Sequence, residues 1–190
     1  MDTHELCATI IPFNIKRKGF TDLTGAFPHK SIIGNLYAMV MYDYDSNIIL
    51  VEPIKNRQTE TIHNALLNTH KVTNEIVSNP KVYIMDNKCS SDLREAMTNY
   101  EIDFQLAPPH MNRKNAAERA IRTCKNHFIS EFSTKDIYFP ISEWDRLLSQ
   151  CVITLNILIN YRVNPSLSAY ALTFGPYVLI NILWKPLEPA

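Results

Sequence analysis

The chain has 190 residues and balances 19 Lys and Arg against 19 Asp and Glu, so its formal net charge is zero. Hydrophobic residues make up 46% and charged residues 20%, a composition that excludes a disordered tail and a membrane protein and favours one well-buried domain. The neutral total gives no argument for nucleic-acid binding, although a local basic patch can still provide one.

The cysteines and the N-terminal residues give an expectation for the cellular compartment of the protein. Four cysteines lie far apart, at positions 7, 89, 124 and 151, and no C-x-x-C pair occurs. This spacing predicts neither a zinc site nor a disulfide framework, and reduced thiols indicate a cytosolic or nuclear protein. The N-terminal stretch has no charged region ahead of its apolar residues, so secretion is not expected.

The first half of the chain alternates strand and helix patterns. The expected elements are, in order, a weak strand GFTDLT at 19–24, a doubly covered strand NLYAMVMY at 35–42, a returning strand NIILVE at 47–52, a helix over 58–77 and a short buried strand KVYIMD at 81–86. Asp43 and Asp45 lie at the turn of the predicted hairpin and are interpreted as structural.

The second half predicts helices around one more strand. We expect a helix over 90–100, an edge strand EIDFQL at 101–106, a helix from about Asn115, and a longer helix over 142–161. The apolar stripe of the long helix comprises Trp144, Leu148, Cys151, Leu155 and Leu158. Together these elements predict an α/β fold, a mixed five-stranded sheet with helices on both faces.

Three acids occupy positions that such a fold can bring together. Asp22 lies in the first strand, Asp86 ends the fourth strand, and Glu118 opens the helix after the fifth. Ligands collect at strand ends in open α/β sheets. Three carboxylates there would form a hard oxygen site suited to Mg²⁺ or Mn²⁺, and two such ions can promote phosphoryl transfer.

Each acid also has a structural interpretation. Asp22 can shape a turn before Thr24, and Asp86 can cap the loop after its strand. Glu118 completes a capping box with Asn115 as the N-cap, and Arg122 is its i+4 ion-pair partner. The spacing alone does not decide between structure and chemistry.

Longer motifs carry more information. In order, the chain contains TDLTGAFP (21–28), GNLYAMVMYDYDSN (34–47), EPIKNR (52–57), YIMDN (83–87), APPHMNRKNAAERAIRT (107–123) and NPSLSAYALTFGPY (164–177). Together they resemble the catalytic core of integrases from retrotransposons and retroviruses, most closely the copia-like and related elements. The resemblance implies an RNase H-like fold and a metal-binding Asp-Asp-Glu triad, here Asp22, Asp86 and Glu118.

The resemblance also implies an activity and partners. The expected activity is metal-dependent DNA phosphoryl transfer (3′-end processing and strand transfer) with two Mg²⁺ or Mn²⁺ ions. Expected partners are element and target DNA and further copies of the chain, with no membrane and no small-molecule substrate. An active protein would work in the nucleus, and an inactive one would remain cytoplasmic. The alternative is a decayed remnant that only binds nucleic acid or protein.

The same comparison of motifs predicts the domain boundaries and identifies two positions that differ from the integrase pattern. We expect an N-terminal extension at 1–18, the integrase catalytic core at 19–163, and a truncated C-terminal extension of the core at 164–190. Lys88 stands near Asp86 where a glycine or an acid is more usual, and Ala116 replaces a common glycine.

Basic residues cluster on the helix that carries Glu118. On a helical wheel Glu118, Arg122 and Lys125 share one face, while the buried stripe comprises Ala117, Ile121, Cys124 and Phe128. A basic helix face is often only solvated, but beside a metal site it can contact phosphates. The predicted nucleic-acid-binding residues are Lys114, Arg119, Arg122 and Lys125.

Overall fold

The computed structural model describes residues 18–74, 80, 82–85, 91–99, 102–106 and 114–175. Of residues 74, 92 and 114–118 it describes the backbone only. One five-stranded sheet with the order β3-β2-β1-β4-β5 forms the centre of these residues. Its strands are β1 (Lys18–Leu23), β2 (Tyr37–Asp43), β3 (Ile49–Ile54), β4 (Val82–Met85) and β5 (Phe104–Leu106).

The sheet is mixed, as the sequence predicts. β1 pairs antiparallel with β2, and β2 pairs antiparallel with β3. β1 also pairs parallel with β4, which in turn pairs parallel with β5. The weakly patterned strand β1 is therefore the central strand, and β5 is an edge strand as expected.

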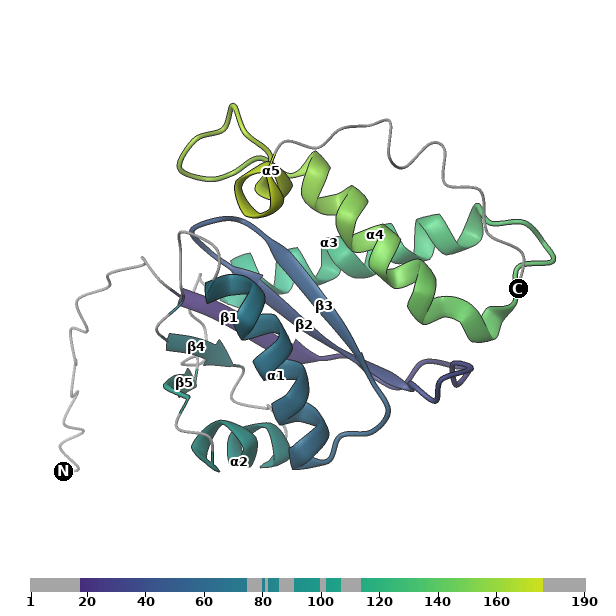
Figure 1. The fold of residues 1–190 in the computed structure, drawn as a ribbon, viewed down its shortest axis with the longest axis horizontal. Coiled ribbons are helices and arrows are strands. Elements are labelled where there is room, and N and C mark those ends of the chain that lie inside the picture. Colours follow the sequence, from purple (N-terminus) through teal and green to yellow (C-terminus); the bar gives the residue numbers. More distant parts are fainter. Residues whose placement is uncertain are drawn as a thin grey trace, which may run out of the picture.

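Helices cover both faces of the sheet (Figure 1). One face packs on α1 (Thr59–Asn74) and α2 (Ser91–Asn99) through a core that includes Met39, Leu66 and Leu93. The other face packs on α3 (Lys114–Ser133) and α4 (Trp144–Leu158). A 3-10 turn (Ile141–Glu143) precedes α4, and α5 (Ala169–Phe174) follows it. The predicted fold class is confirmed.

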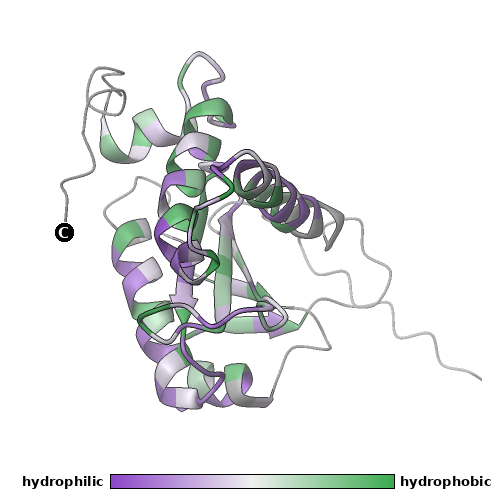
Figure 2. Cartoon of the chain, turned by 90° about the vertical axis from the view of Figure 1, so that its right-hand side faces the viewer, coloured by the Kyte–Doolittle hydropathy of each residue, from purple (hydrophilic) through white to green (hydrophobic). Residues whose placement is uncertain are grey.

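The pattern of hydropathy explains this layering. The strands between the helices are mostly hydrophobic, and each helix carries both hydrophobic and hydrophilic residues (Figure 2). Six of the seven residues of β2 are buried, which agrees with its predicted coverage on both faces. No helix among the described residues is long and apolar enough to cross a membrane.

One side chain of the apolar stripe predicted for the long helix lies in solvent. Leu158 is 69% exposed at the last residue of α4, so the buried stripe of that helix ends at Leu155. The chain turns to extended backbone at Ile159, which takes Leu158 off the sheet. Leu106, in edge strand β5, is 37% exposed.

The hairpin between β2 and β3 shows that Asp43 is structural. Its carboxylate is fully buried, and Asp43 Oδ2 accepts a hydrogen bond from the Ser46 backbone N–H at 2.8 Å. The Asp43 backbone N–H donates to the Ile48 carbonyl across the turn. Asn47 has a positive φ of 65°, a conformation that asparagine tolerates better than most residues.

Candidate active site

Asp22 lies near the end of the central strand and points to the α3 face of the sheet. In β1 it pairs with Val40 and follows Phe20 by two residues. Phe20 and Val40 both belong to the core beneath α3 and α4. Because side chains alternate between faces along a strand, and directly paired residues share a face, the Asp22 carboxylate lies on that side too. It is half-buried, and Asp22 Oδ1 accepts the Leu23 N–H at 2.8 Å.

The second predicted acid, Asp86, lies outside the described residues, as does Lys88. The strand before Asp86 is described up to Met85. There β4 runs parallel to β1, with Phe20 opposite Ile84. Ile84 lies in the same core as Phe20, so the α3 face of β4 carries residue 84.

The third predicted acid, Glu118, lies in the first turns of α3. Its side chain is outside those described, so the geometry of its carboxylate stays a prediction. One turn further on, Ile121 is buried in the same hydrophobic cluster as Phe20 and Ile84. The N-terminal part of α3 therefore lies on the sheet face that carries Phe20 of β1 and Ile84 of β4. Asp22 belongs to β1, and Asp86 follows β4 along the chain.

The start of α3 differs from the sequence interpretation. The helix begins at Lys114, so Asn115 is already helical and is not the N-cap that the capping box requires. Of the predicted buried stripe, Ile121, Cys124 and Phe128 are buried, and Ala117 lies outside the described side chains.

The basic residues of α3 lie on more than one side of the helix. Arg119, Arg122 and Lys125 are exposed, and the Lys114 side chain is not among those described. Lys125 borders a groove together with Thr24 and Gly25, the residues that follow β1. Helical spacing thus places Lys125 beside the end of β1, the strand that carries Asp22.

Arg119 borders a different pocket. This pocket, of about 260 Å³, also contacts Tyr42, Asn47 and Arg162. Arg162 lies 4.0 Å from the centre of the Tyr44 ring and donates a 2.7 Å hydrogen bond to the Tyr42 hydroxyl. Burial raises the pKa of Tyr42, partly opposed by the Arg162 charge, so the hydroxyl stays protonated at neutral pH. Sequence reasoning missed Arg162, because its partners lie far away along the chain.

The groove beside Lys125 is larger, about 700 Å³, and mostly apolar. It lies between the segment 24–29 and helix α3. Phe27 stacks on Trp144 with ring centroids 3.9 Å apart, and Trp144 Nε1 donates to the His29 carbonyl at 2.9 Å. These contacts hold the segment after Asp22 against the helical layer.

The chemistry of the predicted donors fits Mg²⁺ or Mn²⁺, because both prefer carboxylate oxygens. Among the described residues, the one group of three side chains that can hold a metal is a different one, His127, Glu131 and Cys151. The triad is not visible as a cluster because two of its three carboxylates lie outside the described atoms.

No protein-family model matches the sequence, and no curated protein matches it. Solved structures do match. The HTLV-2 integrase catalytic core domain, in complex with magnesium and in its trimeric form, aligns with a TM-score of 0.56 at 21% sequence identity, over 83% of this chain and 96% of that one. The chain has the fold of a retroviral integrase catalytic core.

Two further structures agree. The catalytic core domain of BIV integrase aligns with a TM-score of 0.55 at 12% identity, over 83% of this chain and 93% of that one. A simian T-cell lymphotropic virus intasome, in complex with PP2A regulatory subunit B56 gamma, contains a chain that aligns with a TM-score of 0.59 at 20% identity. That match covers 92% of this chain and 58% of the other. Likeness at this identity establishes the fold, and the predicted RNase H-like architecture is confirmed.

Proposed function

We propose that this chain is an integrase-type polynucleotidyl transferase that joins DNA ends to target DNA. The observation that carries the proposal is the position of Asp22 on the sheet face covered by α3, the helix that contains Glu118. A fold can host many functions, so the proposal depends on these acids and on the integrase motifs around them.

The pairing register of the parallel strands β1 and β4 supports a position for Asp86 beside Asp22. Phe20 pairs with Ile84, so continuing the pairing by two residues would set Asp86 opposite Asp22. Neighbouring strands are about 4.8 Å apart, close enough for two carboxylates to share one ion. We propose this continuation for Asp86.

The three acids would hold two divalent ions, and the rest of α3 would hold the DNA. Mg²⁺ or Mn²⁺ bound there would supply activation of the attacking oxygen and stabilisation of the leaving oxygen at phosphorus. Arg122 and Lys125, both exposed on α3, would contact phosphates and fix the backbone without reading sequence. We also propose self-association and, for an active protein, work in the nucleus.

The test is strand transfer by the purified chain on oligonucleotide substrates with Mg²⁺ or Mn²⁺. Glu118→Gln and Asp22→Asn should abolish product, because an amide supplies neither the charge nor the bidentate oxygens of a carboxylate. Glu60→Gln is the matched control, since Glu60 is an exposed acid in the first turn of α1 on the opposite face. It should leave activity unchanged.

Melting temperatures separate chemistry from folding. Glu118→Gln should melt within about 2 °C of the unaltered chain, because the ion pair predicted between Glu118 and the exposed Arg122 would contribute only about 0.3–0.5 kcal/mol. Activity that survives in Glu118→Gln would refute the assigned role of this acid. DNA binding without any strand transfer by the unaltered chain would instead support a non-catalytic remnant.

A further inference from the structure

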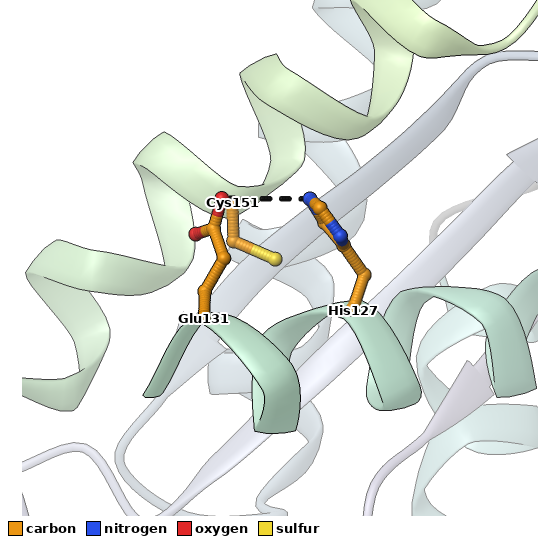
Figure 3. A group of neighbouring side chains, drawn as sticks. All are labelled: His127, Glu131 and Cys151. Carbon is orange, nitrogen blue, oxygen red and sulfur yellow. Dashed lines mark ion pairs between the residues drawn. The ribbon is translucent and has the colours of Figure 1, made fainter. Parts of the chain in front are cut away.

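A second group of metal-binding side chains lies between helices α3 and α4. His127 and Glu131 stand one turn apart on α3, and Cys151 projects from α4 toward them (Figure 3). One ligand atom from each residue lies within 4.8 Å of those of the other two. His127 Nε2 and Glu131 Oε1 are 3.5 Å apart. The three donors therefore already converge on one point.

The hydrogen bonding of this group is incomplete. Within the described part of the chain, the buried atoms His127 Nε2 and Glu131 Oε2 have no hydrogen-bond partner. Cys151 is completely buried and its thiol is free. Buried polar atoms are nearly always paired, and an ion is one established explanation when they are not. These two atoms without hydrogen bonds, beside the free thiol of Cys151, thus point to a ligand common to all three side chains.

We propose that His127, Glu131 and Cys151 bind one transition-metal ion of the zinc class, with Zn²⁺ as the physiological ion, and thereby connect α3 to α4. Imidazole nitrogen, carboxylate oxygen and thiolate sulfur are the ligands that zinc uses, whereas a thiolate disfavours Mg²⁺. A histidine and a second ligand four residues later lie on one face of a helix. The site is separate from the proposed oxygen-donor triad and has a different metal preference.

The geometry needs only a small adjustment. Zinc–ligand bonds of about 2.0–2.3 Å place tetrahedral ligand atoms roughly 3.4–3.8 Å apart. The donors, now within 4.8 Å of one another, reach that spacing when the side chains move by about 1 Å. The side chains of His127 and Glu131 are 23% and 20% exposed although their Nε2 and Oε2 atoms are buried, so the fourth ligand would be a water molecule that enters as the side chains move.

Binding must remove the proton of the thiol. The proton of the Cys151 thiol passes to solvent when the sulfur binds the ion, because the thiolate is the form that binds metals. Apparent affinity should rise with pH, because metal and proton compete for the same sulfur.

The experiment uses Co²⁺ as a spectroscopic probe for the zinc site. The full chain carries Cys7→Ser and Cys89→Ser, so that Cys124 and Cys151 are the remaining thiols. Titration with Co²⁺ should produce a thiolate-to-cobalt charge-transfer band that saturates at one ion per chain. Added Zn²⁺ should remove the band, and added Mg²⁺ should leave it unchanged.

Three substitutions locate the ligands. Cys151→Ser should eliminate the band, and His127→Ala should weaken Co²⁺ binding at least tenfold. Cys124→Ser is the matched control, because Cys124 is also a buried free cysteine but is not one of the three proposed ligands. The Cys124→Ser protein should keep the charge-transfer band. A band that survives in Cys151→Ser, or disappears in Cys124→Ser while that protein remains folded, overturns the proposal.

A second measurement is independent of the buried cysteine. Zn²⁺ at a hundredfold excess over its dissociation constant should raise the melting temperature of the unaltered chain by about 5–10 °C. His127→Ala, which alters a partly exposed side chain, should show no such rise. An equal rise in both proteins, or none in the unaltered chain, overturns the proposal.

Discussion

The side chain of Asn156 joins helix α4 to the open edge of the sheet. Asn156 is 1% exposed, and its amide makes two hydrogen bonds to the backbone of Ile49 in β3. Asn156 Nδ2 donates to the Ile49 carbonyl at 2.6 Å, and Asn156 Oδ1 accepts the Ile49 N–H at 2.9 Å. β3 is the terminal strand of the sheet, so its outer edge has no neighbouring strand to supply these bonds.

Replacing Asn156 with alanine would leave both groups of Ile49 buried and unpaired. Each such group costs about 1–3 kcal/mol, so the free energy of unfolding should fall by about 2–6 kcal/mol. Total stabilities of domains are about 5–15 kcal/mol, so this loss is a large fraction. At 2–4 °C for each kcal/mol, the central value of about 4 kcal/mol lowers the melting temperature by roughly 8–16 °C.

Urea unfolding followed by circular dichroism measures the change. Asn126→Ala is the matched control, because Asn126 is an exposed asparagine on helix α3. It has the same gain in helix propensity without the buried bonds, and it should change stability by no more than about 0.5 kcal/mol. If Asn156→Ala differs from this control by less than 0.5 kcal/mol, the two bonds do not anchor α4, and the reasoning is wrong.

Three further predictions concern DNA binding by α3, the protonation of His70 and the hydrogen bond of Trp144. Replacing both Arg122 and Lys125 with alanine should weaken DNA binding. It should also reduce the magnitude of the slope of log affinity against log salt concentration by about 2. Lys71→Ala, on α1 at the opposite face of the sheet, is the control and should leave that slope unchanged. Burial lowers the pKa of His70, so the folded state disfavours the protonated ring; stability should be full above about pH 6.5 and decline as the pH falls below it. His70→Gln should make that decline shallower in urea titrations at several pH values, and an unchanged slope would contradict the assignment. Trp144→Phe removes the hydrogen bond to the His29 carbonyl but keeps a ring beside Phe27, so it should cost about 1 kcal/mol and about 2–4 °C in melting temperature. A melting temperature equal to that of the unaltered chain would show that this bond contributes nothing.

The sequence alone determined the elements and the layers of this fold. Periodicity located all five strands and the main helices to within a few residues, because β2 and the buried faces of α1 and α3 carry their apolar residues at the spacing that burial requires. Six ordered motifs indicated the integrase core, which the solved structures confirm at the level of the fold. The interpretation of Asp43 also needed only local turn chemistry.

Tertiary structure decided which distant residues meet. Hydrophobic periodicity depends only on the residues of one strand. It could not show that β1, whose pattern is weak, lies at the centre of the sheet, because that position depends on pairing with β2 and β4. Spacing could not bring Cys151 to His127 and Glu131, because the packing of α3 on α4 sets that distance. Leu158 fits the apolar stripe of α4 but lies in solvent, because the helix ends there and the chain turns away. Local pattern specifies the face of an element, and only packing specifies what that face contacts.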